Sequence, residues 1–315
     1  MRKFSPLLWL GAAILAGWIL WHRLQSVRFA DVVQQIRDVG AARLAIALAC
    51  CATCYALVGV YERLAYRVVT GRSEFWPPFR TGVIANPIGR AIGAALFSGG
   101  ALRYRLYSKF GIDAVQVGAI VLLAVMPFAL SALLLIDISL LTQPEKASKA
   151  LHLSTGAINV IGAIGLCAEA AWIVLVARRK APFVIRGKTI QLPTLKHTLA
   201  QIAIGVTQLS SIAGILYALM PAELDMSWPA FVGIYCIAFV AGQMSNVPAG
   251  LGVLEAALLL MLPQVPPGKL IGAVLAYRGI FELLPLIVAL IAFFAVEASS
   301  KARAGQPREI NQARV

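Results

Sequence analysis

Long apolar runs with almost no charge recur along the chain, and they constrain its fold more than any other feature. Each is about 18–25 residues long, which is what an α-helix needs to cross roughly 30 Å of hydrocarbon. Apolar residues make up 60% of the 315 residues and charged residues 13%, whereas about a quarter of a typical soluble domain is charged. The sequence therefore predicts an all-α polytopic membrane protein with about seven or eight transmembrane helices.

The clear spanning candidates are followed by a polar tail. We expect one membrane domain over residues 1–298 and a polar, disordered cytoplasmic tail over residues 299–315. The first run is predicted to be a retained span, because His22 and Arg23 follow it directly and no small-residue cleavage motif closes it. The spanning candidates are residues 6–22, 42–60, 115–141, 156–177, 199–219, 228–246 and 270–296.

The formal net charge is +14, from 28 Lys and Arg against 14 Asp and Glu. Much of this excess lies in short loops, where it sets topology and meets anionic headgroups. No nucleic-acid-binding motif accompanies it, so nucleic acid is not an expected partner. The five cysteines all lie inside apolar runs and the three histidines are scattered, so neither a metal site nor a cofactor is predicted.

Two apolar segments, residues 80–100 and 247–264, contain helix-breaking residues. Non-helical backbone at membrane depth is tolerated only where protein or a wet cavity covers it. The two segments also resemble each other, which suggests an inverted repeat of broken helices that meet near the midplane. Chance similarity is the alternative, since Gly and Pro are common in membrane helices. The residues expected to break the helices are Asn86, Pro87, Asn246, Pro248, Gly250 and Gly252.

The loop charges suggest an orientation. The very basic loop 178–197 is predicted to be cytoplasmic, and the acidic loop 220–228, which has no Lys or Arg, is predicted to be outside. Both termini are then cytoplasmic if residues 80–100 are re-entrant and enter and leave from the cytoplasmic side. Residues 228–264 start and end outside, either as two spans or as a re-entrant pair.

Several charged residues lie inside apolar segments, where each costs about 2.5–3.5 kcal/mol to insert and therefore indicates function or pairing. Arg278 and Glu282 share a helix face at i, i+4. One reading places these residues around a polar cavity in which arginine binds phosphate; the other is a set of structural ion pairs. Glu169 has no partner identifiable from sequence, and Asp137 is expected nearer headgroup water. The candidate substrate-binding residues are Arg90, Arg103, Glu255, Arg278 and Glu282.

The chain shows little sign of catalytic machinery. No nucleophile elbow, zinc-protease motif or ATP-binding loop is present, so transport would be passive or driven by a gradient. We predict that the protein is not an enzyme. A membrane-embedded transferase that uses Glu255 as a base is a third, less favoured reading.

The sequence resembles the lysylphosphatidylglycerol synthase transmembrane family. The resemblance rests on "NVPAGLGVLEAALL" (246–259) and "AYRGIFELLPLIVAL" (276–290), with Ala249 in place of a family glycine. The early "NPIGRAIGAALFSGGALRYRL" (86–106) resembles the family's first Gly-rich segment, with Arg103 or Arg105 as its downstream arginine. The chain ends soon after its last span, so the resemblance implies a stand-alone member without the aminoacyl-transfer domain.

The resemblance implies a flippase-like protein of the bacterial inner membrane. We expect it to move an anionic or modified phospholipid between leaflets, through a groove between the two broken segments. The arginines would attract the lipid phosphate, helped by free N–H groups and the positive dipole ends of the broken helices. The alternative is a non-transporting membrane scaffold that serves a separate lipid-modifying enzyme, which would then be its partner.

Overall fold

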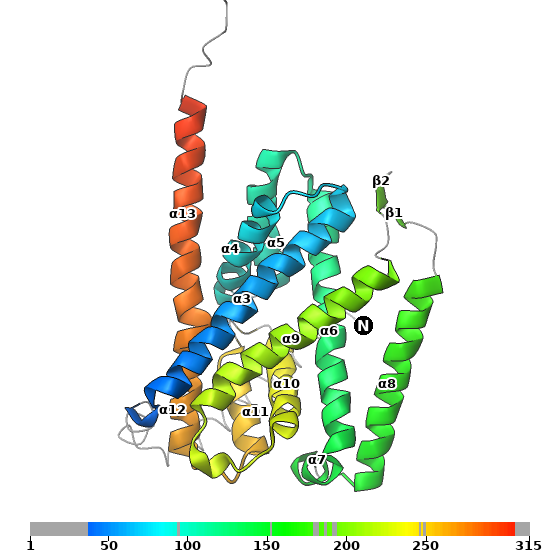
Figure 1. Ribbon diagram of the computed structural model, residues 1–315, viewed down its shortest axis with the longest axis vertical. Coiled ribbons are helices and arrows are strands. Elements are labelled where there is room, and N and C mark those ends of the chain that lie inside the picture. Colours follow the sequence, from blue (N-terminus) through cyan, green and yellow to red (C-terminus); the bar gives the residue numbers. More distant parts are fainter. Residues whose placement is uncertain are drawn as a thin grey trace, which may run out of the picture.

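Helices build nearly all of the structure. The computed structural model describes residues 37–92, 95–151, 153–178, 183–185, 188–190, 194–245, 247 and 250–305 (Figure 1). The predicted all-α membrane fold is confirmed, with one antiparallel two-stranded hairpin, in which Val184 pairs with Thr189, as an unpredicted addition. The helices and strands of ordinary geometry are α3 (Ala41–Thr70), α4 (Trp76–Ile92), α5 (Ala95–Tyr107), α6 (Ala114–Thr142), α7 (Pro144–Leu151), α8 (Thr155–Arg178), β1 (Phe183–Ile185), β2 (Lys188–Ile190), α9 (Leu195–Leu219), α10 (Trp228–Met244), α11 (Val253–Met261), α12 (Pro267–Arg278) and α13 (Leu284–Gly305).

The predicted spans coincide with these helices wherever the structure describes them. Five helical stretches are long and apolar enough to cross a membrane, namely α3, α6, α8, α9 and the continuous α12–α13, and α10 is a shorter apolar helix. The predicted span 6–22 lies outside the described residues. Helix α3 runs ten residues beyond the predicted end at residue 60. In the predicted tail, residues 299–305 belong to α13, and residues 306–315 lie outside the described part.

Large apolar side chains cover the outer surfaces of the long helices. Ile164 of α8 is 64% exposed, and Ile291 and Phe294 of α13 are 66% and 65% exposed. A soluble protein rarely exposes continuous apolar surface of this kind, whereas lipid tails solvate it. The arrangement is therefore that of a multi-pass membrane protein.

The first unconventional segment forms a helical hairpin of α4 and α5. The two helices pack against each other, and the Ser98 hydroxyl donates a hydrogen bond to the Gly89 carbonyl at 2.9 Å. The prediction that Asn86 and Pro87 break the helix is wrong, because α4 continues through both to Ile92. An internal proline removes one backbone hydrogen bond, and neighbouring helices make this tolerable in a membrane protein. Helix α4 ends at Ile92 and α5 begins at Ala95.

The second unconventional segment forms a shorter hairpin of α10 and α11. Helix α11 has nine residues, so it extends about 13.5 Å and covers only half of the hydrocarbon layer. The segment before it contains Gly250 (φ +63°) and Gly252 (φ +80°). These left-handed conformations suit glycine because it has no Cβ. Two other predicted breakers, Asn246 and Pro248, lie outside the described residues.

Gly250→Ala is expected to destabilise the protein, because alanine in this backbone region costs about 1–3 kcal/mol. An added Cβ would also approach the Gly242 Cα of α10 to 3.0 Å, so backbone would have to move. Thermal unfolding in detergent measures the effect. Gly118→Ala in α6 is the matched control, since its Cβ would meet nothing within 4 Å. Equal unfolding temperatures for the two variants would contradict the close approach of Gly250 to α10.

The two hairpins lie toward opposite ends of the molecule. Figure 1 places α4 and α5 toward the end that carries the β-hairpin, and α10 and α11 toward the end that carries α7. The connection between α9 and α10, which contains Glu223 and Asp225, also lies at the α7 end. The two segments thus lie toward opposite ends, as the inverted-repeat hypothesis expects, although α4 is not broken at Asn86 and Pro87.

Candidate functional site

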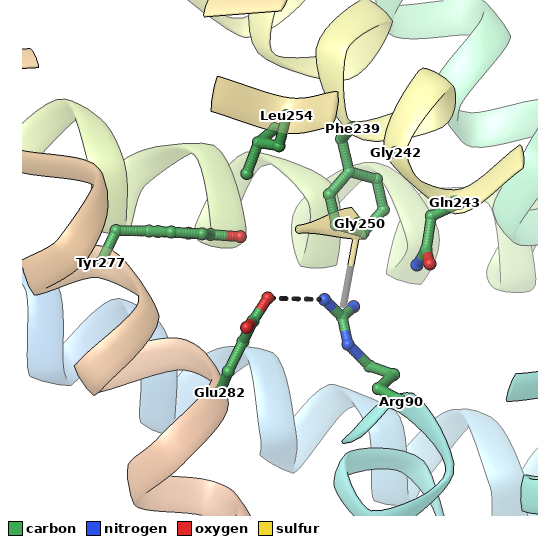
Figure 2. A pocket seen from close by; sticks show the side chains of 8 residues that line it. All are labelled: Arg90, Phe239, Gly242, Gln243, Gly250, Leu254, Tyr277 and Glu282. Carbon is green, nitrogen blue, oxygen red and sulfur yellow. Dashed lines mark ion pairs between the residues drawn. The ribbon is translucent and has the colours of Figure 1, made fainter. Parts of the chain in front are cut away.

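A small cleft lies where the two hairpins approach each other. Its volume is about 230 Å³, including space open to the outside. Arg90 enters it from near the end of α4, and Gln243 from the end of α10 (Figure 2). Residues far apart in the sequence thus form one polar pocket. Its lining consists of Arg90, Phe239, Gly242, Gln243, Gly250, Leu254, Tyr277 and Glu282.

Arg90 is the cation that lines this cleft, and its carboxylate partner holds it loosely. Its Nη2 lies 3.6 Å from Oε1 of Glu282, beyond ordinary hydrogen-bond distance. Its guanidinium carbon lies 4.6 Å from the ring centre of Phe281 and 5.3 Å from that of Phe239. Cation–π contacts of this kind stabilise a desolvated cation without using its N–H donors. The Arg90 side chain is only 13% exposed, so this cation is largely shielded from solvent.

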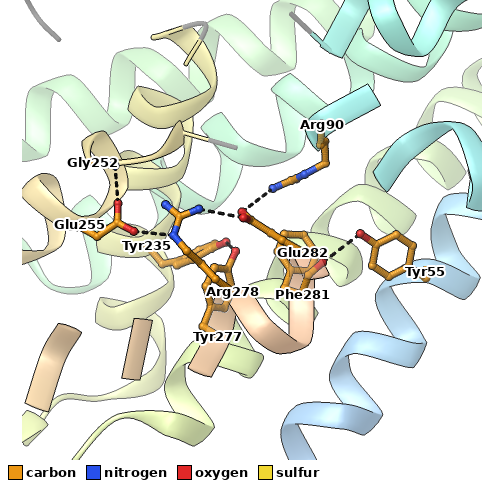
Figure 3. Close-up of polar contacts among 9 residues, drawn as sticks. All are labelled: Tyr55, Arg90, Tyr235, Gly252, Glu255, Tyr277, Arg278, Phe281 and Glu282. Carbon is orange, nitrogen blue, oxygen red and sulfur yellow. Dashed lines mark hydrogen bonds and ion pairs between the residues drawn. The ribbon is translucent and has the colours of Figure 1, made fainter. Parts of the chain in front are cut away.

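Arg278 is held far more tightly, by two carboxylates. Its Nε donates to Oε1 of Glu255 at 2.6 Å, and its Nη1 donates to Oε2 of Glu282 at 2.9 Å. The other oxygen of Glu255 accepts the Gly252 N–H at 2.9 Å. Figure 3 shows the four charged side chains in one row, Glu255–Arg278–Glu282–Arg90. Two cations and two anions alternate, so the row is neutral as a unit.

The carboxylate of Glu255 therefore occupies the amino end of α11. It closes a capping interaction with the Gly252 N–H and sits where the helix dipole favours negative charge. The sequence analysis expected free N–H groups at this helix end to bind an external anion. One of them, the Gly252 N–H, instead donates to Glu255 within the protein. The arginines beside it are the remaining candidates for binding an external anion.

A π-helical turn, Gly279–Leu283, presents Glu282 to both arginines. Pro285 follows it and has no N–H, so it cannot donate to the carbonyls of Ile280 and Phe281, five and four residues before it. Two side chains of α3 satisfy these carbonyls: Cys51 Sγ donates to Ile280 at 3.2 Å and Tyr55 Oη donates to Phe281 at 3.1 Å. Such wide turns are frequent at functional sites.

Two tyrosines support this turn from below the charged row. The hydroxyls of Tyr235 and Tyr277 are 2.7 Å apart and both side chains are fully buried. Tyr277 also packs against the ring of Phe281, with centroids 5.4 Å apart. Sequence reasoning did not select either tyrosine as a site residue, although Tyr277 precedes Arg278 directly.

Arg103 is held in a different cluster. Its Nε and Nη2 donate to both carboxylate oxygens of Glu62 at 2.9–3.0 Å, and Tyr107 Oη donates to the same carboxylate at 3.1 Å. Both charged side chains are buried, and the pair joins α3 to α5. The structure thus brings together Arg90, Glu255, Arg278 and Glu282 as the sequence suggested, and places Arg103 in a structural ion pair. The alternative family position, Arg105, stacks over Phe293 at 5.6 Å.

Comparison with known proteins gives relatives that match most of the chain. Uncharacterized protein slr0712 of Synechocystis sp. is 31% identical over 269 residues, which cover 85% of this chain and 83% of that protein. Inner membrane protein YbhN of Escherichia coli is 27% identical over 285 residues, 88% of this chain and 87% of that protein. The phosphatidylglycerol lysyltransferase of Staphylococcus haemolyticus is 24% identical over 283 residues, which cover 86% of this chain but 31% of the transferase. The chain matches no family model.

Proposed function

We propose that this chain, which belongs to the lysylphosphatidylglycerol synthase transmembrane family, moves an anionic phospholipid between the leaflets of a bacterial inner membrane. The relatives support this setting, because one is named an inner membrane protein and others are named for phosphatidylglycerol. The match covers only 31% of the lysyltransferase, so we propose lipid movement for this chain and do not carry the aminoacyl transfer over to it.

The observation that carries the proposal is the meeting of Arg90 and Glu282 between two hairpins that come from opposite ends. Transporters built from inverted broken helices bind their substrates near the midplane, where the repeats meet. A lipid headgroup that crosses the bilayer must pass this depth, where an unpaired phosphate is very costly. Arginine is well suited to bind it, since its donors match phosphate geometry.

The proposed cycle begins with an exchange of anions at Arg90. The lipid phosphate displaces Glu282, whose contact with Arg90 is long, and Glu282 keeps its hydrogen bond to Arg278. Arg90 therefore gains a phosphate partner, while the Glu282 carboxylate stays paired with Arg278. The cleft of about 230 Å³ is below the range of about 300–1,000 Å³ usual for small-molecule pockets, so the hairpins must move apart to admit a headgroup.

The orientation follows from the basic loops. The β-hairpin loop and the end of α13 lie at the end of the molecule toward which α4 and α5 lie (Figure 1). The acidic connection between α9 and α10 lies at the opposite end. With the positive-inside rule, we propose that the first end, which carries the end of α13, faces the cytoplasm.

Arg90→Gln is expected to slow lipid movement at least about tenfold, since a charge-assisted hydrogen bond contributes about 1.5–3 kcal/mol and each 1.4 kcal/mol is a factor of ten. The assay uses purified protein in vesicles that contain a fluorescent phosphatidylglycerol, which a membrane-impermeant reductant quenches in the outer leaflet. The variant should fold, because Glu282 keeps Arg278 as a partner.

Arg80→Gln, on the same helix, is the matched control. Arg80 is exposed and its guanidinium carbon lies 5.8 Å from the Phe110 ring centre, so this loss of charge should leave the rate unchanged. Equal slowing by both variants would overturn the role of Arg90. A wild-type protein that moves no lipid but co-purifies with a lipid-modifying enzyme would favour the scaffold function.

A further inference from the structure

A second buried charged cluster, separate from the cleft, lies between α6 and α8. Glu169 is 8% exposed and Asp137 is 7% exposed. Gly162 and Gly165 of α8 face the same side as Glu169, and an added Cβ at Gly165 would meet the Asp137 carboxyl at 2.2–2.4 Å. The Asp137 carboxylate thus rests on the surface of α8, one helical turn from Glu169. The two carboxyl groups are therefore neighbours at the contact between α6 and α8.

Neither carboxylate oxygen of Glu169 has a hydrogen-bond partner among the described residues, although both oxygens are fully buried. Buried polar groups without a partner are rare, and each calls for an explanation. Glu169 lies nine residues from the end of α8, or about 13.5 Å along the axis, which is well inside a membrane-spanning helix.

The elements packed around Glu169 carry few charged side chains among the described residues. Helix α6 contributes Asp137 as its only titratable side chain. The short helix α7, which lies beyond the end of α6, adds Glu145 among the described side chains. On α9, Lys196 and His197 lie in the first turn and Tyr217 in the last, and on α8 itself the nearest charge along the helix is Arg178. Among the described residues, Glu169 forms no ion pair.

We propose that Asp137 and Glu169 form a proton-binding site that couples a proton gradient to lipid movement. Two neighbouring carboxylates away from water cannot both stay ionised, because desolvation and mutual repulsion disfavour the second charge. A proton held between them removes the repulsion. Intramembrane acids of this kind serve as proton relays in pumps and transporters. Asp137 lies five residues from the end of α6 that precedes α7. Glu169 lies farther from α7, in the second half of α8. In this proposal, protons therefore enter from the α7 end.

Helix α6 links this site to the cleft. Ser139, two residues after Asp137, packs onto Gly233 of α10 so closely that an added Cβ would meet its side chain at 2.0 Å. Further along, Phe128 of α6 contacts Phe239 of α10 with ring centroids 6.2 Å apart. Phe239 lies over Arg90. Protonation that shifts α6 against α8 would therefore shift the helix that lines the cleft.

Proton binding is tested without transport, by infrared difference spectroscopy of the protein in lipid as pH is raised. The wild type should lose a carboxylic-acid C=O band that Glu169→Gln lacks and that Asp137→Asn alters. Glu145→Gln, at an exposed carboxylate of α7, is the matched control and should keep the band. A spectrum of Glu169→Gln equal to that of the wild type would overturn the proton site.

Coupling rests on the proposed lipid function and is tested in the vesicle assay with and without a pH gradient. The gradient should accelerate the wild type and the Glu145→Gln control. Glu169→Gln should keep the rate measured without a gradient and lose the acceleration. Equal acceleration in Glu169→Gln and the wild type would overturn the coupling. Absence of lipid movement in every protein, with the infrared band intact, would overturn the proposed function and coupling but leave the proton site standing.

Discussion

Glu62→Ala is expected to destabilise the protein by about 3–5 kcal/mol, because it leaves the guanidinium of Arg103 buried without its carboxylate partner. Three hydrogen bonds of 2.9–3.0 Å join the two side chains, and Glu62 is 2% exposed. Tyr107 would also lose the acceptor of its hydroxyl. Chemical or thermal unfolding in detergent measures the loss. Glu74→Ala, at an exposed residue before α4, is the matched control and should change stability by less than about 0.5 kcal/mol.

The double variant Glu62→Gln with Arg103→Met separates the cost of an unpaired charge from the cost of a lost contact. Glutamine retains an acceptor for the Tyr107 hydroxyl, and methionine fills the arginine volume without charge. Replacement of a buried ion pair by neutral groups is often close to neutral in stability. The double variant should therefore be more stable than Glu62→Ala. If the double variant is less stable than Glu62→Ala, the ion pair itself stabilises the contact between α3 and α5.

The sequence predicted most of the spans because a span needs only length and apolar character, which are local properties. It also predicted the break before α11, since closely spaced glycines allow the positive φ angles of Gly250 and Gly252. Pro87 misled the same reasoning. A proline removes one hydrogen bond but does not force a turn, and α4 runs past it.

The charged residues of the row, Arg90, Glu255, Arg278 and Glu282, were found because a charge at membrane depth is costly and must be paired or used. Glu62 was missed for the opposite reason. The predicted span ended at residue 60, so Glu62 fell outside it, whereas α3 continues to Thr70. Long arginine side chains such as those of Arg63 and Arg67 can extend from the end of a membrane helix toward headgroups. With α3 ended too early, Arg103 had no visible partner and was grouped with the site.

The π-helical turn could not be predicted from local sequence. Pro285 predicts only that the carbonyls of Ile280 and Phe281 need other donors. The donors are Cys51 and Tyr55, 229 and 226 residues away along the chain. Their positions depend on how α3 packs against the last span, which is a tertiary property.

Glu255→Gln and Arg278→Gln are each expected to cost about 3–5 kcal/mol of stability and to abolish lipid movement, since each leaves a buried charge short of its partner. These single losses do not show whether the pair binds substrate or only holds the fold. The double variant Glu255→Gln with Arg278→Gln separates the two roles. It removes one positive and one negative charge, and the Arg90–Glu282 pair that remains is neutral. Glutamine at residue 255 can still accept the Gly252 N–H.

The double variant should therefore recover to within about 1–2 kcal/mol of the wild type, because no uncompensated charge stays buried. If Arg278 takes part in headgroup binding, lipid movement in vesicles stays at least about tenfold below the wild type despite this recovery. Recovery of both stability and lipid movement would assign the Glu255–Arg278 pair a purely structural role. Arg90 would then be the only cation of the charged row left to bind the phosphate.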